Sequence, residues 1–551
     1  MKRSHAFSGF IVCTFILLLI SSPRASDKVG PVRIGVPHDW TTQHVLFSRE
    51  GLIKNPSVIY NEPRVLHQAI ERWQTGRGLS SRANDTALAA VSQPQGDWSV
   101  SLNLGRIAPN MFPAKYSFDP GSTPNCTNDY VVFGLNHVGQ NNQANLVAFN
   151  NLYTGTPAGV CAGTTPTVMF AYNISTITAG RILTSPVLSL DGTKVAFVES
   201  GNISGNNMSI FHVVTWKSDA GNGTAPNLPA VPGVGNTASM TSLTYAAALN
   251  TRSSPWVDYK TDTAYVGADD GKIYKILNVF NGTPTLAGAP WPVTLSNNVR
   301  PAAPVFDNRL KLVMVGNQSG TFYSISATGV VKSLVVGRSG GTNPGILAPA
   351  IVDVTNATSF VVSANDGTSG VLVQVDSSTM TLMSKARIGL ASRSGTAVSL
   401  YQPAFSNDYF DNPESGVARL CGTGAADTTP WQYAFGFTGI TLNATAASSS
   451  QILTSTAARC TGWTEFFNPN IGEGGTDFFF FGLTADCTGA GTSGCVVSRD
   501  AAGTLTKANV TGGPTGVVVD NYSTQSQASS IYFTGATTPN TAYKMLQSTL
   551  Q

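Results

Sequence analysis

Apolar runs of strand length that end in an aspartate or asparagine recur along the chain. The clearest example is residues 300–326, RPAAPVFDNRLKLVMVGNQSGTFYSIS, in which three apolar runs are separated by turn-forming residues. Its first run is a phrase of small or proline residues, then apolar residues, then Asp or Asn. Eight such phrases occur, and they end at Asp119, Asp191, Asp258, Asp307, Asp353, Asn407, Asn468 and Asp520. The pattern therefore predicts a repeated β-sheet unit.

The spacing of the phrases indicates how these units are arranged. The seven steps from Asp119 to Asp520 cover 401 residues, about 57 per step, and single steps range from 46 to 72 residues. So irregular a period does not suit a solenoid, whereas four-stranded blades with loops of variable length accommodate it. We therefore predict an all-β propeller over residues 98–551. It should have eight blades, or seven if the first long repeat is irregular.

The two ends of this region complement each other. The last repeat, residues 513–551, holds three candidate strands, and WSVSLNLG at residues 98–105 precedes the first phrase without a place in any repeat. Pairing this segment with the last repeat would complete a four-stranded blade and remove two exposed sheet edges. We expect the ring to be closed by this exchange.

The first part of the chain differs from the repeats. Residues 1–26 have a basic start and a short apolar run, and are predicted to be a secretory signal, with an uncleaved anchor as the alternative. Residues 77–97 have the polar, Ser/Ala/Gly-rich composition of a linker. Between them, residues 27–76 form an extension that we expect to be dispensable for the stability of the ring.

One helix is predicted in this extension, at Asn61–Gln74. Asn61 is placed to cap it, and the apolar residues that share one face are Val65, Leu66, Ile70 and Trp73. Two histidines, His38 and His44, flank the sequence DWTTQ further upstream. Because a six-residue step places them on no common helix face, ordinary loop histidines are favoured over a metal site.

The cysteines predict disulfide bonds. Six remain after the predicted signal, an even number in a chain expected to be exported, and fifteen connectivities are possible. Proximity in sequence favours pairing Cys126 with Cys161, Cys421 with Cys460, and Cys487 with Cys495. No Cys-x-x-Cys or Cys/His cluster indicates zinc.

The charge balance excludes one class of partner. Removing residues 1–26 takes away three basic residues and no acid, so 30 Lys and Arg remain against 30 Asp and Glu. A neutral chain with 11% charged residues lacks the positive surface that neutralises phosphates in nucleic-acid-binding proteins. No stretch after the predicted signal reaches 18 apolar residues, so we expect no stable membrane span.

The third repeat carries a family resemblance. TAYVGADDGKIYKI at residues 263–276 resembles the repeat of quinoprotein-type (PQQ-like) propellers, in which a YVG strand, a Gly turn and a short aromatic strand recur. Residues 129–200 are similar to uncharacterised secreted bacterial propellers, a family that implies no activity. Membership of the quinoprotein dehydrogenases would imply a vicinal disulfide, a stacking Trp, a calcium site and an acidic base. No two cysteines are adjacent here, and no Trp-bearing docking phrase recurs, so the resemblance implies the fold and no cofactor.

Three local patterns could mark chemistry. GRSGG, around Ser339, matches the nucleophile elbow G-x-S-x-G, but no histidine follows His212 to take the proton. The Asp or Asn that ends each phrase could form a ring of ligands at the propeller mouth, although an Asx turn is favoured. Glu465 stands where the other phrases carry uncharged residues, and it could reach a ligand in the central channel. A local register shift is the simpler explanation of Glu465.

These observations favour a binding protein over an enzyme. We expect a secreted protein, extracellular or periplasmic and monomeric, that binds a glycan or a protein partner through its loop-rich faces, with no cofactor, metal or catalytic residue. Long loops such as residues 484–494 offer sparsely charged surface for such contacts. The alternative is an exported enzyme on a propeller scaffold, either a quinoprotein-type oxidoreductase or a carbohydrate-active enzyme.

Overall fold

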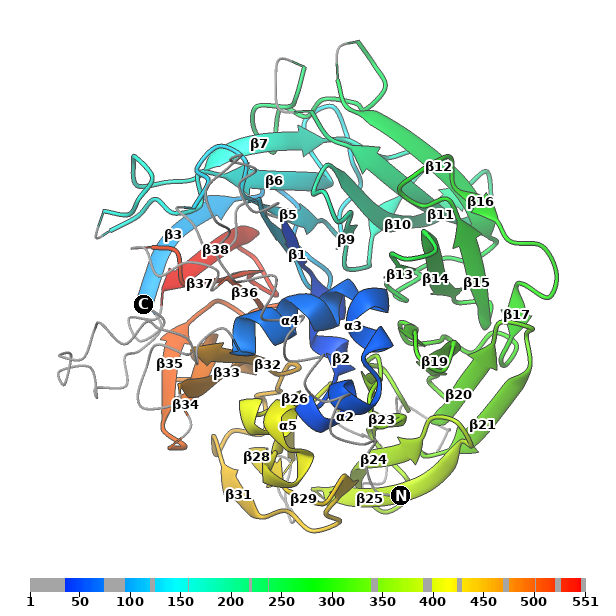
Figure 1. Ribbon diagram of the computed structural model, residues 1–551. Helices are drawn as coiled ribbons and strands as arrows, with labels where there is room; N and C mark the ends of the chain where they lie inside the picture. The colour runs from blue at the N-terminus through cyan, green and yellow to red at the C-terminus, as the bar shows by residue number, and fades with distance from the viewer. Residues whose placement is uncertain are drawn as a thin grey trace, which may run out of the picture.

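The protein is an eight-bladed β-propeller with short helices at the centre of one face (Figure 1). The computed structural model describes residues 35–73, 95–118, 124–156, 158–217, 221–235, 237–337, 345–389, 399–423, 429–468, 475–500, 502–520 and 527–546. The predicted signal, most of the predicted linker and Ser339 therefore lie outside the described residues. Among the described helices, none is long and apolar enough to cross a bilayer.

The first four blades are antiparallel sheets built by consecutive strands. Blade 1 contains β4 (Ala114–Ser117), β5 (Tyr130–Gly134), β6 (Leu146–Asn150) and β7 (Thr167–Tyr172). Blade 2 contains β8 (Arg181–Ile182), β9 (Val187–Leu188), β10 (Lys194–Ile203), β11 (Asn206–Thr215) and β12 (Ser239–Ala246). Blade 3 contains β13 (Trp256–Asp258), β14 (Thr263–Ala268), β15 (Lys272–Leu277), β16 (Thr285–Leu286) and β17 (Val293–Thr294). Blade 4 contains β18 (Val305–Asp307), β19 (Leu312–Gly316), β20 (Thr321–Ser326) and β21 (Val331–Val335).

Blades 5 to 7 continue the ring with the same strand order. Blade 5 contains β22 (Ile351–Asp353), β23 (Thr358–Ser363), β24 (Gly370–Asp376) and β25 (Thr381–Ile388). Blade 6 contains β26 (Ala404–Phe405), β27 (Ala418–Thr423), β28 (Pro430–Phe435) and β31 (Ser448–Gln451), with α5 (Asn407–Asp411), η3 (Pro413–Ser415) and the hairpin β29 (Phe437–Thr438)–β30 (Thr441–Leu442) as insertions. Blade 7 contains β32 (Thr464–Asn468), β33 (Thr476–Ala485), β34 (Ser493–Asp500) and β35 (Leu505–Asn509).

Blade 8 joins the two ends of the propeller. Its inner strands are β36 (Val518–Asp520), β37 (Ser530–Thr534) and β38 (Thr541–Leu546), and its outer strand is β3 (Gln95–Ser101), which pairs antiparallel with β38. The predicted exchange of strands is therefore present, and the closing strand begins three residues earlier than the expected Trp98. Trp98 is buried against Phe149 of blade 1 and Tyr532 of blade 8.

The N-terminal extension crosses the central channel. β1 (Val36–His38) pairs with β4 in blade 1, and β2 (Val45–Leu46) pairs in parallel with β22 in blade 5, four blades further round the ring. Between them lies the 3-10 helix η1 (Trp40–His44). The helices α2 (Arg49–Lys54), α3 (Ser57–Asn61) and α4 (Pro63–Trp73) then cover this end of the channel (Figure 1). We call residues 36–73 the plug.

The plug corrects two sequence-based expectations. It contains three α-helices and a 3-10 helix where one helix was predicted, and Asn61 ends α3 instead of capping α4. The buried face of α4 consists of Arg64, Val65, Gln68 and Ala69, whereas Ile70 is exposed. Of the predicted apolar face, Val65 is buried and Trp73 packs against the apolar core, but Ile70 is exposed. Arg64 and Gln68 are buried on the inner face because backbone carbonyls accept hydrogen bonds from them.

The phrase-ending aspartates form turns. Asp307 Oδ1 accepts hydrogen bonds from the backbone N–H groups of Arg309 and Leu310, 2.9 Å each. Asp191, Asp258 and Asp353 likewise accept from the N–H two residues later. These contacts are those of an Asx turn, so at these four positions the turn role that the sequence favours is confirmed.

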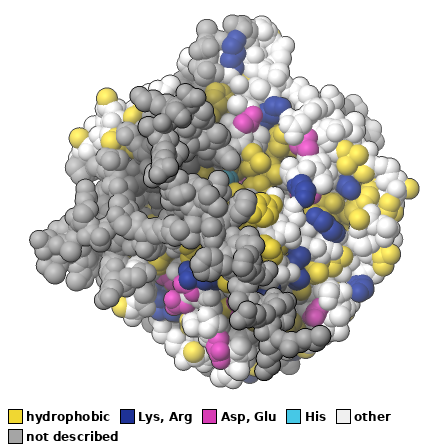
Figure 2. Space-filling view, viewed as in Figure 1, with side chains coloured by type: hydrophobic (Ala, Val, Ile, Leu, Met, Phe, Trp, Pro, Cys, Tyr) yellow, Lys and Arg dark blue, Asp and Glu magenta, His cyan; other side chains and the backbone are white. Residues whose placement is uncertain are grey.

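The surface at the plug face has mixed charge. On its described part, Lys and Arg side chains are interspersed with Asp and Glu and do not gather into one stripe (Figure 2).

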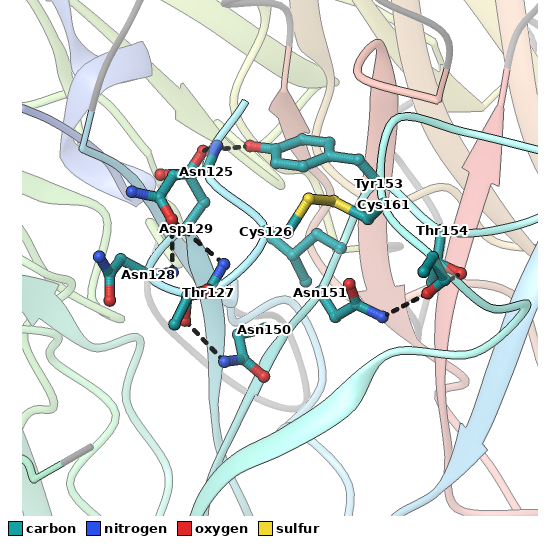
Figure 3. The surroundings of a disulfide bond; sticks show 12 residues. Asn125, Cys126, Thr127, Asn128, Asp129, Asn150, Asn151, Tyr153, Thr154 and Cys161 are labelled. Carbon is teal, nitrogen blue, oxygen red and sulfur yellow. Dashed lines mark hydrogen bonds between the residues drawn. A yellow bond between two sulfur atoms is a disulfide. The ribbon is translucent and has the colours of Figure 1, made fainter. Parts of the chain in front are cut away.

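Three disulfides connect the pairs that proximity in sequence predicts. Cys126–Cys161 ties the turn before β5 to the loop after β6 within blade 1 (Figure 3). Cys421–Cys460 links β27 of blade 6 to the segment before β32 of blade 7, and Cys487–Cys495 closes the loop between β33 and β34. The bonds enclose sequence steps of 35, 39 and 8 residues. Disulfides of this kind are consistent with an oxidising compartment.

Candidate functional site: a pocket at the open mouth of the channel

The plug is held at the ends of the innermost strands. The Arg64 guanidinium lies over the rings of Trp256 and Tyr259, 4.2 and 4.6 Å from their centroids, and donates to the Val257 carbonyl at 2.9 Å. It also forms an ion pair with Glu62 at 2.8 Å, and both side chains are almost fully buried. A buried arginine with this many partners fixes α4 over the channel.

Glu465 lies at the same end of the channel, on β32 of blade 7. Both of its carboxylate oxygens accept hydrogen bonds from Arg72 of α4, at 2.9 and 2.6 Å. Burial, followed by the nearby Glu465 carboxylate, raises the pKa of Asp477 well above its usual value. Glu465 therefore has an intramolecular partner from the plug, and its contact with a ligand stays a prediction.

Two histidines of the plug, His38 and His44, are buried. His38 lies on β1, and burial followed by the Lys115 charge lowers the pKa of His38 to about 3. The Nδ1 atom of His44 lies 2.7 Å from the Trp40 carbonyl, and burial lowers the pKa of His44 to about 4. Both are neutral at pH 7. Within the described residues, no group of three His, Cys, Asp or Glu side chains is arranged to hold a metal ion.

The opposite mouth of the channel contains a cavity of about 250 Å³. Its floor is Trp40 of the plug. The Trp40 ring packs edge-on against the Trp256 ring, with 5.8 Å between the ring centroids. Its walls come from the residues just before the innermost strands of six successive blades, Phe112, Ser185, Ser254, Ala303, Pro349 and Gln402. We call this cavity the mouth pocket. A pocket of this size suits a small ligand or the end of a larger one.

Hydrogen bonds between the walls hold the mouth pocket in shape. The Phe112 N–H donates to Ser185 Oγ at 2.9 Å, and the Ser185 N–H donates to Ser254 Oγ at 2.8 Å, so blades 1, 2 and 3 are linked in series. The side chain of Ser253, next to the pocket, donates to the Ala302 carbonyl of the following blade at 2.9 Å. A rim tied in this way is preorganised for a ligand.

Two arginines give the mouth pocket an excess of positive charge. Arg300 is paired with both carboxylate oxygens of Asp269, at 2.8 to 3.1 Å. Arg252 is an exposed residue on the rim and forms no ion pair with any residue that the structure describes. Partial burial followed by the Arg300 charge lowers its pKa, and Asp269 offsets part of this. Two guanidinium groups that repel each other beside one carboxylate would be stabilised by a bound anion.

The pocket also contains buried donors. Trp40 Nε1 and Gln402 Nε2 are buried and have no hydrogen-bond partner among the described protein atoms. Both residues line the mouth pocket. An unmet buried donor costs stability unless water or a ligand accepts from it. Together with Arg252, these groups make the pocket rich in donors.

A second arrangement lies on the outer strands of blade 2. Ser242 Oγ is 2.9 Å from His212 Nδ1, and His212 Nε2 is 2.9 Å from Glu199 Oε2. Glu199 in turn accepts from the Thr176 N–H and hydroxyl. No local motif predicts this relay, because its members lie on three strands. Ser242 does not line the mouth pocket.

Comparisons with known proteins assign this chain to no family. No family model and no curated protein matches the sequence. Among solved structures, Sqt1 from Chaetomium thermophilum is 12% identical with a TM-score of 0.45 and covers 84% of this chain and 96% of its own. Sqt1 from Saccharomyces cerevisiae is 9% identical with a TM-score of 0.48 and covers 83% and 99%. BamB from Moraxella catarrhalis is 12% identical with a TM-score of 0.29 and covers 63% and 95%.

These likenesses are too distant to transfer a function. The β-propeller fold rests on the strand topology of this chain, and the resemblance of its repeats to PQQ-like propellers stays a prediction. The function must therefore be argued from the site.

Proposed function

We propose that this protein is a secreted, non-catalytic binding module and that the mouth pocket receives an anionic sugar at the end of a glycan. The observation that carries the proposal is Arg252, a guanidinium beside Arg300 that forms no ion pair among the described residues. A carboxylate between the two arginines would lower their mutual repulsion and accept charge-assisted hydrogen bonds.

The rest of the pocket suits a sugar. Trp40 supplies an aromatic floor, and its Nε1 and the Gln402 amide can donate to hydroxyl or carboxylate oxygens. Export is supported by the predicted signal at residues 1–26 and by the three disulfides.

A glycan array tests this proposal. The purified protein should bind glycans that end in uronic or other acidic sugars in preference to their neutral counterparts, and Arg252→Gln should abolish the preference. Lys332→Gln, which removes one positive charge from the outer strand β21, is the matched control and should bind as the wild type does. Equal binding of acidic and neutral glycans, or binding unchanged in Arg252→Gln, would refute the proposal. If the protein captured a protein partner in the absence of any glycan, the ligand would be a protein and not a glycan.

The relay Ser242–His212–Glu199 favours a second candidate, an exported hydrolase. A serine hydrogen-bonded to a histidine that is oriented by a carboxylate has the components of an activated nucleophile. Covalent labelling by a fluorophosphonate probe, lost in Ser242→Ala, would establish this function. A screen for dye-linked dehydrogenase and hydrolase turnover, with and without calcium and quinone, tests the other enzyme classes, a quinoprotein-type oxidoreductase and a carbohydrate-active enzyme. Activity that is lost in Glu465→Gln would indicate an active site in the channel.

A further inference from the structure

The strand that closes the ring has a bulge at Asp97. In the pairing of β3 with β38, Gly96 lies opposite Met545 and Trp98 opposite Lys544, so Asp97 is an extra residue with no partner across the ladder. Successive side chains of a regular strand point to opposite faces, but a bulge re-aims one of them. The side chains of Asp97 and Trp98 are consequently both buried.

The bulge places the Asp97 carboxylate against a buried lysine. Asp97 Oδ2 lies 2.7 Å from Lys544 Nζ, and both side chains have an exposed fraction of 0%. The other oxygen, Oδ1, accepts a hydrogen bond from the Thr156 N–H at 3.1 Å. Lys544 Nζ also donates to the Thr154 carbonyl at 3.2 Å and to Gln527 Oε1 at 2.9 Å, which fixes its position.

The loop after β6 is shaped around this carboxylate. Gly155 has a φ of +152°, and a Cβ atom at this residue would lie 1.9 Å from Asp97 Oδ1. Glycine is therefore required beside the carboxylate. The Cys126–Cys161 disulfide ties the connection between β6 and β7 to the turn before β5, near Tyr153 and Thr154 (Figure 3).

The surroundings make the charge on Lys544 costly. Trp98 and Tyr532, whose ring centroids are 5.9 Å apart, lie in the same buried region. Burial lowers the pKa of Lys544 to about 8, partly offset by Asp97 and Asp520. A buried ion pair is held less strongly against proton transfer than an exposed one, because desolvation penalises both charges. A neutral amine next to a protonated carboxyl is a nucleophile next to an electrophile.

We propose that Asp97 and Lys544 form an intramolecular isopeptide bond that covalently closes the ring. Across the 2.7 Å contact Lys544 Nζ passes one proton to Asp97 Oδ2; its lone pair then attacks Cγ, a C–N bond forms, and the C–Oδ2 bond breaks. Oδ2 leaves as water with this proton and a second one from Nζ, while the third Nζ proton stays on the amide; no oxidant or cofactor is consumed. The Thr156 N–H stabilises the charge that develops on Oδ1, as a backbone donor does in an oxyanion hole.

The bond would join the two ends of the propeller. Asp97 lies on β3, the first strand of the ring in chain order, and Lys544 lies on β38, the last strand. A bond between them therefore closes a covalent loop that contains all eight blades. A second buried pair, Lys115 with Asp520 at 2.7 Å, lies on the innermost strands of blades 1 and 8. It provides an internal comparison, because no bulge or tailored glycine accompanies it.

The intact mass of the reduced, denatured wild-type protein tests the proposal. It should be about 18 Da below the mass of the same chain without the bond, and proteolysis should yield one branched peptide that contains Asp97 and Lys544. Lys544→Arg keeps the charge but should show the full mass, whereas Lys115→Arg should keep the loss. A wild-type chain of full mass, or a loss of water mapped to other residues, would overturn the proposal.

Asp97→Asn supplies a second test, with a substitution that should leave the protein folded. Attack of Lys544 on the asparagine amide releases ammonia, about 17 Da, and gives the same product as the wild-type protein. The two proteins should therefore converge on one mass. A difference of about 1 Da between them, the difference between Asp and Asn, would mean that no bond forms.

Discussion

At the scale of single residues, the buried charges are the least ordinary feature of this propeller. Asp307 ends the phrase of blade 4, is fully buried, and has a pKa raised from 3.8 to about 6, chiefly by burial. Because the folded protein binds this proton more tightly than the unfolded chain, the free energy of unfolding should fall as pH rises from about 4 to about 6. A shift of about two units corresponds to about 3 kcal/mol at pH 7.

Asp307→Asn should therefore stabilise the protein at pH 7, by about 1 to 3 kcal/mol, and flatten the dependence on pH between 4 and 6. The asparagine oxygen can still accept from the N–H groups of Arg309 and Leu310. Asp353→Asn, at the same place in blade 5, is the control: its Oδ2 accepts from Tyr409 and Asn356, so this variant should lose about 1 to 2 kcal/mol. Urea unfolding at several pH values measures both, and a destabilised Asp307→Asn protein at pH 7 would contradict the assignment.

The pair Arg72–Glu465 makes a second residue-scale prediction. Arg72→Met leaves the Glu465 carboxylate buried beside Asp477, so we expect a loss of about 3 to 5 kcal/mol in the free energy of unfolding. The double variant Arg72→Met/Glu465→Gln removes both charges and should regain part of that loss. A double-mutant cycle from chemical denaturation gives the coupling, and strictly additive effects would show that the pair does not hold α4 in place.

At the scale of elements, the closing strand β3 carries an anchor that can be tested. Trp98 is buried between blades 1 and 8, and Trp98→Ala should cost about 3 to 5 kcal/mol. Ser99, the next residue on the same strand, is exposed, and Ser99→Ala should change stability by less than about 0.5 kcal/mol. Thermal unfolding distinguishes the two, and equal melting temperatures would mean that ring closure does not depend on β3.

The plug is the element for which the structure reverses an expectation drawn from the sequence. Trp40, Phe47 and Val65 are buried in the same apolar cluster as blades 3 to 5, and Arg64 and Arg72 are paired inside the channel. Deleting residues 27–73 would expose Trp256 and leave Glu465 without Arg72, so we now expect a melting temperature lower by many degrees. If the truncated protein had the same melting temperature as the wild type, the extension would be dispensable for the stability of the ring, as the sequence predicts.

At the scale of the whole molecule, the fold was accessible from the sequence because its signal is repeated. Eight phrases, an unassigned strand and local cysteine pairs predict the ring, its closure and its disulfides. The plug and the mouth pocket were not accessible, because their contacts join distant parts of the chain. Arg72 and Glu465 are 393 residues apart, and the pocket collects isolated residues from six blades. No local pattern predicts such a pair, and the apolar periodicity of α4 predicted burial of Ile70, which is exposed.

The central claim is that the mouth pocket, floored by the plug and charged by Arg252, selects an acidic sugar. Isothermal titration calorimetry with glucuronic acid and with glucose, on the wild-type protein and on Arg252→Gln, tests it directly. We expect the wild type to bind the acid about 10- to 100-fold more tightly than the neutral sugar, the range expected for charged hydrogen bonds, and Arg252→Gln to bind both equally. Wild-type affinities that are equal for the two sugars, or a preference that survives in Arg252→Gln, would contradict it.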